Sequence, residues 1–142
     1  MIHVPKRFKT HELVDPATFA ALGDKALEIF RPEALMVLDE LSAFFGDKAI
    51  TINNWKTDGQ FHWRGLRTIE CTQGAARGPH RVGAAWDINV AGMTPDEVFA
   101  AITGNPDNFP HIRRMEDGAV TTGWTHVDVW EHDAPGILIF KP

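Results

Sequence analysis

Two strand-like segments carry an acid and an imidazole whose spacing could bring them together. Apolar and polar side chains alternate over residues 84–90 (AAWDINV) and over residues 124–130 (WTHVDVW), which is the pattern of half-buried strands. Because successive side chains point to opposite faces of a strand, Asp87 and His126 each lie opposite the apolar residues of their segment. If the two strands are neighbours, Asp87 and His126 meet in one cleft.

A second histidine, His80, lies in the loop just before the first of these strands. Two imidazole nitrogens and one carboxylate oxygen form a normal ligand set for catalytic zinc, which keeps its fourth position for water or substrate. Gly83 and Ala85 are small and leave room for an ion or a substrate. Imidazole and carboxylate also suit other divalent metals, so zinc is preferred and not proven. A surface pair of His80 and Asp87 without a metal is the structural alternative.

Two motifs resemble those of a known superfamily. The segment HRVGAAWD, from His80 to Asp87, resembles the His-x-x-Gly-x-Ala-x-Asp motif of the D-alanyl-D-alanine peptidases and hedgehog-like zinc proteins. The segment HVDV, from His126, is similar to their second metal motif, and its place 39 residues after Asp87 agrees with them. INNWKTDGQFHWRGLR, the opening FKTHELVDP and the closing GILIF are similar to stretches of phage-encoded members.

The resemblance implies a role for several residues of this chain. It implies His80, Asp87 and His126 as ligands of Zn2+, and an arginine ahead of the first motif that holds a substrate carboxylate. Arg67 and Arg64, in the segment WRGLR, are the candidates, with a slight preference for Arg67. A guanidinium can pair with a carboxylate through two parallel hydrogen bonds. Solvated loop positions are the alternative interpretation of both arginines.

Two positions depart from the pattern of the superfamily. Gly78 stands two residues before His80, where many members have serine. Gly123 stands three residues before His126, where active enzymes commonly have the carboxylate that serves as general base. Asp128 shares a strand face with His126 and is our candidate base, with orientation of His126 as its alternative role. The carboxylates at greater distance are Glu116, Asp117 and Glu131.

The resemblance implies a zinc metallopeptidase that acts on the stem peptides of bacterial peptidoglycan, as a D-alanyl-D-alanine carboxypeptidase or an endolysin-like enzyme of phage type. Gly123 motivates an alternative, in which a phage or prophage structural or binding module keeps the metal and has lost catalysis. Virion proteins are the partners that this alternative implies. A third hypothesis is an amidase or another hydrolase that uses the same zinc site on a substrate outside peptidoglycan.

Composition argues against some classes of partner and indicates the compartment in which the protein is made. The 142 residues include 14 basic and 19 acidic side chains, for a net charge of −5 at pH 7, whereas nucleic-acid binding requires a basic face. No apolar run approaches the ~20 residues of a membrane helix, and the N-terminus lacks the apolar core of a signal peptide. We therefore expect no nucleic-acid or membrane partner. We also expect synthesis in the cytoplasm, with action on the cell wall only after release.

The elements that must position these residues indicate one α+β domain over residues 1–142, with a small, mostly antiparallel sheet and helices packed on one face. Apolar spacing predicts a helix over 33–45, and the capping box Thr94-Pro95-Asp96-Glu97 predicts another over 95–103. A short helix is expected within 7–22 and an ordered loop over 54–79. Predicted strands are 50–53, 84–90, 112–116 at an edge, 124–130, and 136–140 as the neighbour of 124–130.

Overall fold

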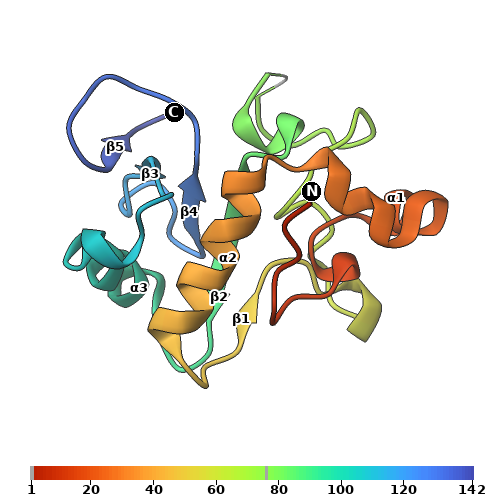
Figure 1. Ribbon diagram of the computed structural model, residues 1–142, viewed down its shortest axis with the longest axis horizontal. Helices are drawn as coiled ribbons and strands as arrows, with labels where there is room; N and C mark the ends of the chain where they lie inside the picture. Colours follow the sequence, from red (N-terminus) through yellow and green to blue (C-terminus); the bar gives the residue numbers. More distant parts are fainter. Residues whose placement is uncertain (1, 76) are drawn as a thin grey trace.

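The computed structural model describes residues 2–75 and 77–142, which form a five-stranded mixed sheet and three α-helices (Figure 1). The predicted α+β class is therefore confirmed. The strand order is β1-β2-β4-β3-β5. The strands are β1 (Ile50–Thr51), β2 (Ala85–Val90), β3 (Arg114–Glu116), β4 (Thr125–Asp128) and β5 (Leu138–Phe140). The α-helices are α1 (Pro16–Leu22), α2 (Pro32–Phe45) and α3 (Pro95–Thr103).

The predicted helices form where their end signals place them. α2 begins with Pro32 in its first turn and ends at Gly46, whose φ of +64° is a conformation that glycine adopts without steric cost. α3 begins with the predicted capping box, because Thr94 Oγ1 accepts from the Glu97 backbone N–H at 3.1 Å and the Glu97 carboxylate accepts from the Thr94 N–H at 3.0 Å. Within the described residues, no helix is both long enough and apolar enough to cross a membrane.

α2 and α3 pack against the same face of the sheet. Trp86 on β2 and Val127 on β4 are register partners with no exposed surface, and they join side chains of both helices in one core. The Trp86 indole N–H donates to the carbonyl of Ala34 on α2 at 2.8 Å. In Figure 1, α2 crosses diagonally over β2. Side chains that alternate with this core face, among them Asp87, therefore point to the other side of the sheet.

The pairing of the last strands corrects two predictions. β4 lies between β2 and β3 and is antiparallel to both, and β3 pairs in parallel with β5. Residues 112–116 are therefore not an edge strand, and 136–140 are not the neighbour of 124–130. A parallel pair cannot be joined by a tight hairpin, and the chain between β4 and β5 makes a wide loop that returns on the far side of β3 (Figure 1). The local alternation of β4 carries no information on which strand borders it.

Within the predicted loop 54–79, of which residue 76 lies outside the described residues, the Arg64 carbonyl accepts the N–H of Asp87 on β2 at 2.8 Å, and residues 77–79 lead into the turn that carries His80. In this loop, one 3-10 turn spans Trp55–Thr57, and another spans Pro79–Val82 at its end. Arg81 fixes the distal part of this loop by donating to the backbone carbonyls of Thr68, Cys71 and Gln73. One side chain thus holds several loop carbonyls beside the first metal motif.

Candidate metal centre

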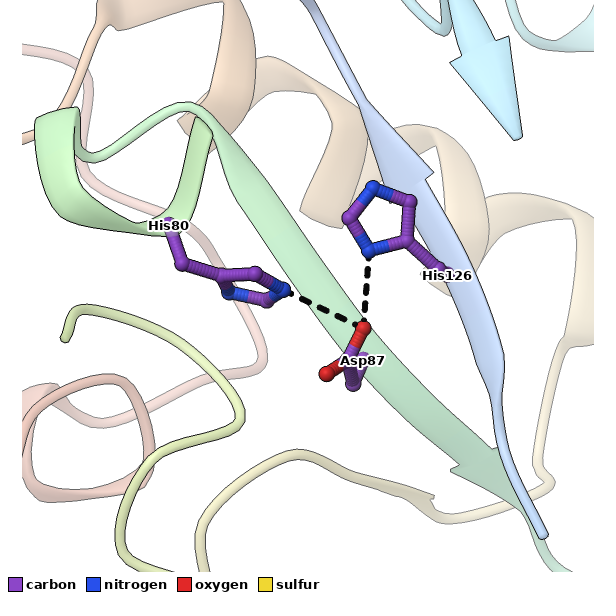
Figure 2. Close-up of side chains that lie close together, drawn as sticks. All are labelled: His80, Asp87 and His126. Carbon is purple, nitrogen blue, oxygen red and sulfur yellow. Dashed lines mark hydrogen bonds and ion pairs between the residues drawn. The ribbon is translucent and has the colours of Figure 1, made fainter. Parts of the chain in front are cut away.

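The three predicted ligands meet on the polar side of the sheet. β2 and β4 are neighbours, which is the condition under which Asp87 and His126 were expected to meet, and their register places Asp87 directly opposite His126. The 3-10 turn Pro79–Val82 brings His80 to the same point. Asp87 Oδ1 lies 2.9 Å from His126 Nδ1 and 3.2 Å from His80 Nε2 (Figure 2). All three side chains are buried, and the group could hold a metal ion.

Each histidine ring is fixed through its second nitrogen. His80 Nδ1 lies 2.8 Å from the carbonyl oxygen of Gly65, and His126 Nε2 lies 2.8 Å from Asp128 Oδ2. Because a carbonyl and a carboxylate only accept hydrogen bonds, these two contacts are satisfied when each of these nitrogens carries the ring proton. In the neutral rings, His80 Nε2 and His126 Nδ1 then present lone pairs to Asp87.

Neutral rings therefore bring three acceptors and no donor to one buried point. Two imidazole lone pairs and a carboxylate oxygen are unfavourable together unless a cation or an extra proton lies among them. A small divalent ion with ligand distances of about 2.0–2.1 Å places tetrahedral donors about 3.3 Å apart. The separations of 2.9 and 3.2 Å are close to that value. The chemistry of the donor set thus fits a metal ion, and all three ligand atoms lie within 4.8 Å of one another.

Without an ion, an extra proton on His126 can stabilise the three acceptor atoms in the same way. Burial acts to lower the pKa of His126, but hydrogen bonds to Asp128 and Asp87 outweigh it and raise the pKa to about 9. Burial likewise acts to raise the pKa of Asp87, but the His80 and His126 imidazoles hold it well below its ordinary value. A metal ion and this proton therefore compete for His126 Nδ1.

Comparison with known proteins finds no match. No family model matches the chain, and no curated protein or solved structure matches it either. The side chains of this site and the two motifs that contain them are therefore the features that indicate a function.

The structure explains why position 83 of the first motif is a glycine. Its φ is +66°, and a Cβ atom there would lie 2.8 Å from both the Ile29 carbonyl oxygen and the Phe30 Cα. The Gly83 carbonyl accepts a hydrogen bond from the Arg31 N–H at 3.0 Å. The turn that carries His80 is thus docked directly on the segment that leads into α2, and only glycine allows so close an approach.

Asp128, the candidate base, lies behind His126. Its side chain has no exposed surface, and Arg114 donates to its two oxygens at 3.0 and 2.9 Å. The backbone N–H of Trp130 donates to the same carboxylate at 3.1 Å. Burial acts to raise the pKa of Asp128, but hydrogen bonds from His126 and Arg114 lower it. This is the geometry of a carboxylate that orients a ligand.

Arg67, the preferred candidate for holding a substrate carboxylate, already contacts a carboxylate of the protein. Its Nη2 donates to Asp87 Oδ2 at 3.0 Å, and its Nε donates to the Trp63 carbonyl at 2.8 Å. Arg67 therefore fixes the Asp87 oxygen that is not shared by the two histidines. Asp87 offers Oδ1 to the site and Oδ2 to Arg67.

Arg64, the second candidate, keeps donors for a ligand. Its guanidinium donates to the Asn89 side chain and lies over the Phe61 ring, 3.6 Å from the centroid. Within residues 2–75 and 77–142, no carboxylate forms an ion pair with Arg64. Burial acts to lower the pKa of this guanidinium, against the charge of Asp87. An arginine held over an aromatic ring, without a carboxylate partner among the described residues, suits an anionic ligand group.

Two cavities meet at the candidate ligands, and Asp87, Arg67 and Trp124 line both of them. One has a volume of about 290 Å³ and contains Arg64 together with polar and aromatic loop side chains. The other has a volume of about 410 Å³ and is more apolar. Its lining includes Pro79, His80, Glu116, Trp124, His126 and Phe140. An extended ligand that fills both cavities would cross the site.

One carboxylate lies closer to the site than the sequence predicted. Gly123 supplies no side chain, and the sequence placed Glu116 at greater distance. The structure brings Glu116 from β3 into the cleft, with Oε1 3.8 Å from His126 Nδ1. The sequence pattern that could have placed Glu116 at the site is the alternation in IRRME, which puts Arg114 and Glu116 on one face of the strand. That pattern becomes useful only when β3 is known to border β4.

Proposed function

We propose that this protein is a zinc-dependent peptidase that acts on the stem peptides of bacterial peptidoglycan. The observation that carries the proposal is the meeting of His80 Nε2, Asp87 Oδ1 and His126 Nδ1 as three acceptors at one buried point beside a cleft. The resemblance of HRVGAAWD and HVDV to the metal motifs of D-alanyl-D-alanine peptidases supports the choice of substrate.

Zinc is the metal that best matches this ligand set. Two imidazoles and one carboxylate are a common protein contribution to catalytic zinc sites, which leave a further position open. When bound, zinc supplies Lewis acidity, which activates water and polarises a carbonyl group. The chain itself keeps both rings in the required tautomer, through the Gly65 carbonyl and through Asp128.

The remaining groups of the site have roles that follow from their contacts. Arg67 holds Asp87 by its second oxygen, so it positions a ligand. Arg64 faces the smaller cavity and binds the terminal or side-chain carboxylate of the peptide, since its donors meet no carboxylate of the described chain. Asp128 keeps the His126 ring oriented and, with Arg114, forms the buried support of the site.

The geometry of the cleft supports a short peptide with a free carboxylate. A peptide whose terminal carboxylate pairs with Arg64 can run past Asp87 into the larger, more apolar cavity, where Trp124 and Phe140 contact small side chains. A stem peptide that ends in D-alanyl-D-alanine has this form, with methyl side chains and a terminal carboxylate.

Hydrolysis of a defined peptide tests the proposal. The zinc-loaded protein is incubated with a synthetic stem pentapeptide and with intact peptidoglycan, and the products are identified by mass spectrometry. We expect release of D-alanine or cleavage of one stem-peptide bond, and no cleavage by His126→Ala. Release of the whole stem peptide from the sugar would instead identify an amidase.

A second candidate function is favoured by Gly123, which supplies no acid at the position that the superfamily motif uses. In that case, the protein is a phage or prophage structural or binding module that retains the metal. Its signature is a full complement of bound zinc together with no cleavage of any stem peptide, across pH and across divalent metals.

A further inference from the structure

We propose that Glu116, on β3, is the proton acceptor of this site, in place of an acid on the chain segment that leads into His126. The inference rests on the proposed hydrolytic function and adds a catalytic residue to it. It starts from the sheet topology, which places β3 beside β4.

The register of β3 and β4 directs Glu116 toward the metal ligands. Arg114 pairs with Asp128 and Met115 pairs with Val127, so the same register continued by one residue sets Glu116 opposite His126. Alternation then places Arg114 and Glu116 on the polar side, while Met115 is fully buried in the core. Glu116 Oε1 lies 3.8 Å from His126 Nδ1, the nitrogen that also faces Asp87.

Among the described side chains that line the two cavities, Glu116 is the carboxylate that still has acceptor capacity. Asp87 uses one oxygen toward the two histidines and the other toward Arg67. Asp128 accepts from Arg114, from His126 and from a backbone N–H, and its side chain has no exposed surface. Glu116 is 19% exposed, lines the larger cavity, and accepts no hydrogen bond from the described residues.

The last strand fixes the end of β3 that carries Glu116. Phe140 on β5 is the register partner of Glu116, and its carbonyl accepts the Asp117 N–H at 2.8 Å. The Phe140 ring stands edge-on to His126, with 5.8 Å between ring centroids. The Glu116 backbone is therefore held on both sides, by β4 and by β5, while its side chain reaches into the cleft.

The distances favour a proton acceptor over a fourth metal ligand. The three candidate ligand atoms lie within 4.8 Å of one another, and Glu116 does not belong to that group. At 3.8 Å from His126 Nδ1, its carboxylate stands beside the ligands. A water molecule next to the ligands would be within hydrogen-bond reach of such a carboxylate.

In the proposed reaction, Glu116 carries one proton from the attacking water to the leaving nitrogen. An O–H bond of the attacking water breaks, its proton moves to Glu116 Oε1, and the water oxygen bonds to the peptide carbonyl carbon. Glu116 then gives the proton to the leaving nitrogen as the C–N bond breaks. One water and one amide become one acid and one amine, and Glu116 returns to the carboxylate form.

The test compares Glu116→Gln with the matched variant Glu131→Gln, which changes an exposed carboxylate away from the cleft. Zinc affinity is measured by chelator competition, and hydrolysis is measured on the stem peptide. We expect both variants to bind zinc nearly as tightly as wild type, because neither carboxylate hydrogen-bonds a candidate ligand, and only Glu116→Gln to lose about 10²–10⁴-fold in kcat. A loss of zinc affinity in Glu116→Gln would make it a ligand and would overturn the proposal.

A second readout separates failure of this inference from failure of the proposed function. Acetohydroxamic acid, added to the zinc-loaded protein, binds as a hydroxamate after giving a proton to a nearby base, and needs no peptide substrate. We expect Glu116→Gln to weaken its binding about tenfold or more, and Glu131→Gln to leave it unchanged. Equal binding to wild type and Glu116→Gln overturns the inference. Weakened binding together with no peptide cleavage by wild type supports the inference and rejects the peptidase.

Discussion

Asp87 Oδ1 lies 2.9 Å from His126 Nδ1, and the opposite nitrogen of the same ring lies 2.8 Å from Asp128 Oδ2. The ring of His126 is thus held between two carboxylates, one of which faces the cleft and one of which is fully buried. A neutral ring can donate to only one of them. The other contact requires either a second ring proton or a metal ion, and this choice makes the site sensitive to both pH and zinc.

The stability of the metal-free protein should fall at alkaline pH. The pKa of His126 is raised to about 9 in the folded protein, against an ordinary value of about 6.5. His126 therefore contributes on the order of 3 kcal/mol to the free energy of unfolding. This contribution is complete below about pH 6.5 and is lost as pH rises toward 9. The lowered pKa values of Asp87 and Asp128 act on the acid side, where their contribution is lost as pH falls below about 4.

Urea unfolding at pH 6.5 and pH 9, with EDTA or with zinc, measures this effect. The EDTA-treated wild type should lose stability between the two values, whereas zinc should abolish most of the loss because it displaces the second proton from His126. The variant His126→Gln should show no such decline. A decline of equal size in His126→Gln would show that another group is responsible.

Asp128→Asn should weaken metal binding rather than remove one chemical step. The substitution takes away the carboxylate that accepts from His126 Nε2 and from Arg114. Loss of a residue that orients a ligand typically costs about 10–100-fold in metal affinity. Chelator competition measures it, with Asp133→Asn as the control because Asp133 is exposed. Unchanged zinc affinity with abolished cleavage would restore Asp128 as the base.

The faces of Asp87 and His126 could be predicted from the sequence because alternation along a strand is a local rule, but their meeting also required β2 and β4 to be neighbours. His80 could be identified from the two motifs, since the turn that carries it directly precedes β2. Glu116 could not be placed in the same way. Its proximity to His126 depends on β3 bordering β4 and on β5 closing the sheet in parallel, which are non-local pairings that no spacing within IRRME or GILIF encodes.

The contacts of the two arginines also lay beyond sequence reasoning. WRGLR offers Arg64 and Arg67 only three residues apart, and both fit a carboxylate partner by residue type. The structure separates them, since Arg67 pairs with Asp87 while Arg64 lies over Phe61. The path of an irregular loop decides which guanidinium meets which partner, and such a path follows no periodicity.

Substitution of Arg67 should affect zinc affinity, whereas substitution of Arg64 should affect KM for the peptide. Arg67→Ala removes the partner of Asp87 Oδ2 and should lower zinc affinity by about tenfold or more. Arg64→Ala should leave zinc affinity unchanged and raise KM for a peptide with a free terminal carboxylate by about 10–100-fold. Amidation of that carboxylate should cancel the effect of Arg64→Ala. The assignment is rejected when Arg64→Ala and wild type respond equally to amidation.

Gly83→Ala should destabilise the protein strongly. A Cβ atom at this position would approach two backbone atoms to 2.8 Å, and its φ is +66°. Gly136→Ala is the matched control, because its φ is +68° and nothing lies within 4 Å of the added atom. The control should cost about 1–2 kcal/mol, and Gly83→Ala should cost more. Thermal unfolding of both variants measures the difference, and equal losses would show that the close approach is without consequence.

Zinc content per chain is the measurement that tests the central claim most directly. Wild-type protein and His126→Ala are purified with excess zinc, passed through a desalting column, and analysed by inductively coupled plasma mass spectrometry. The converging acceptors predict about one zinc ion per wild-type chain and close to none in His126→Ala. Near-zero zinc in the folded wild type, or equal zinc in both proteins, would contradict the claim that His80, Asp87 and His126 form a metal site.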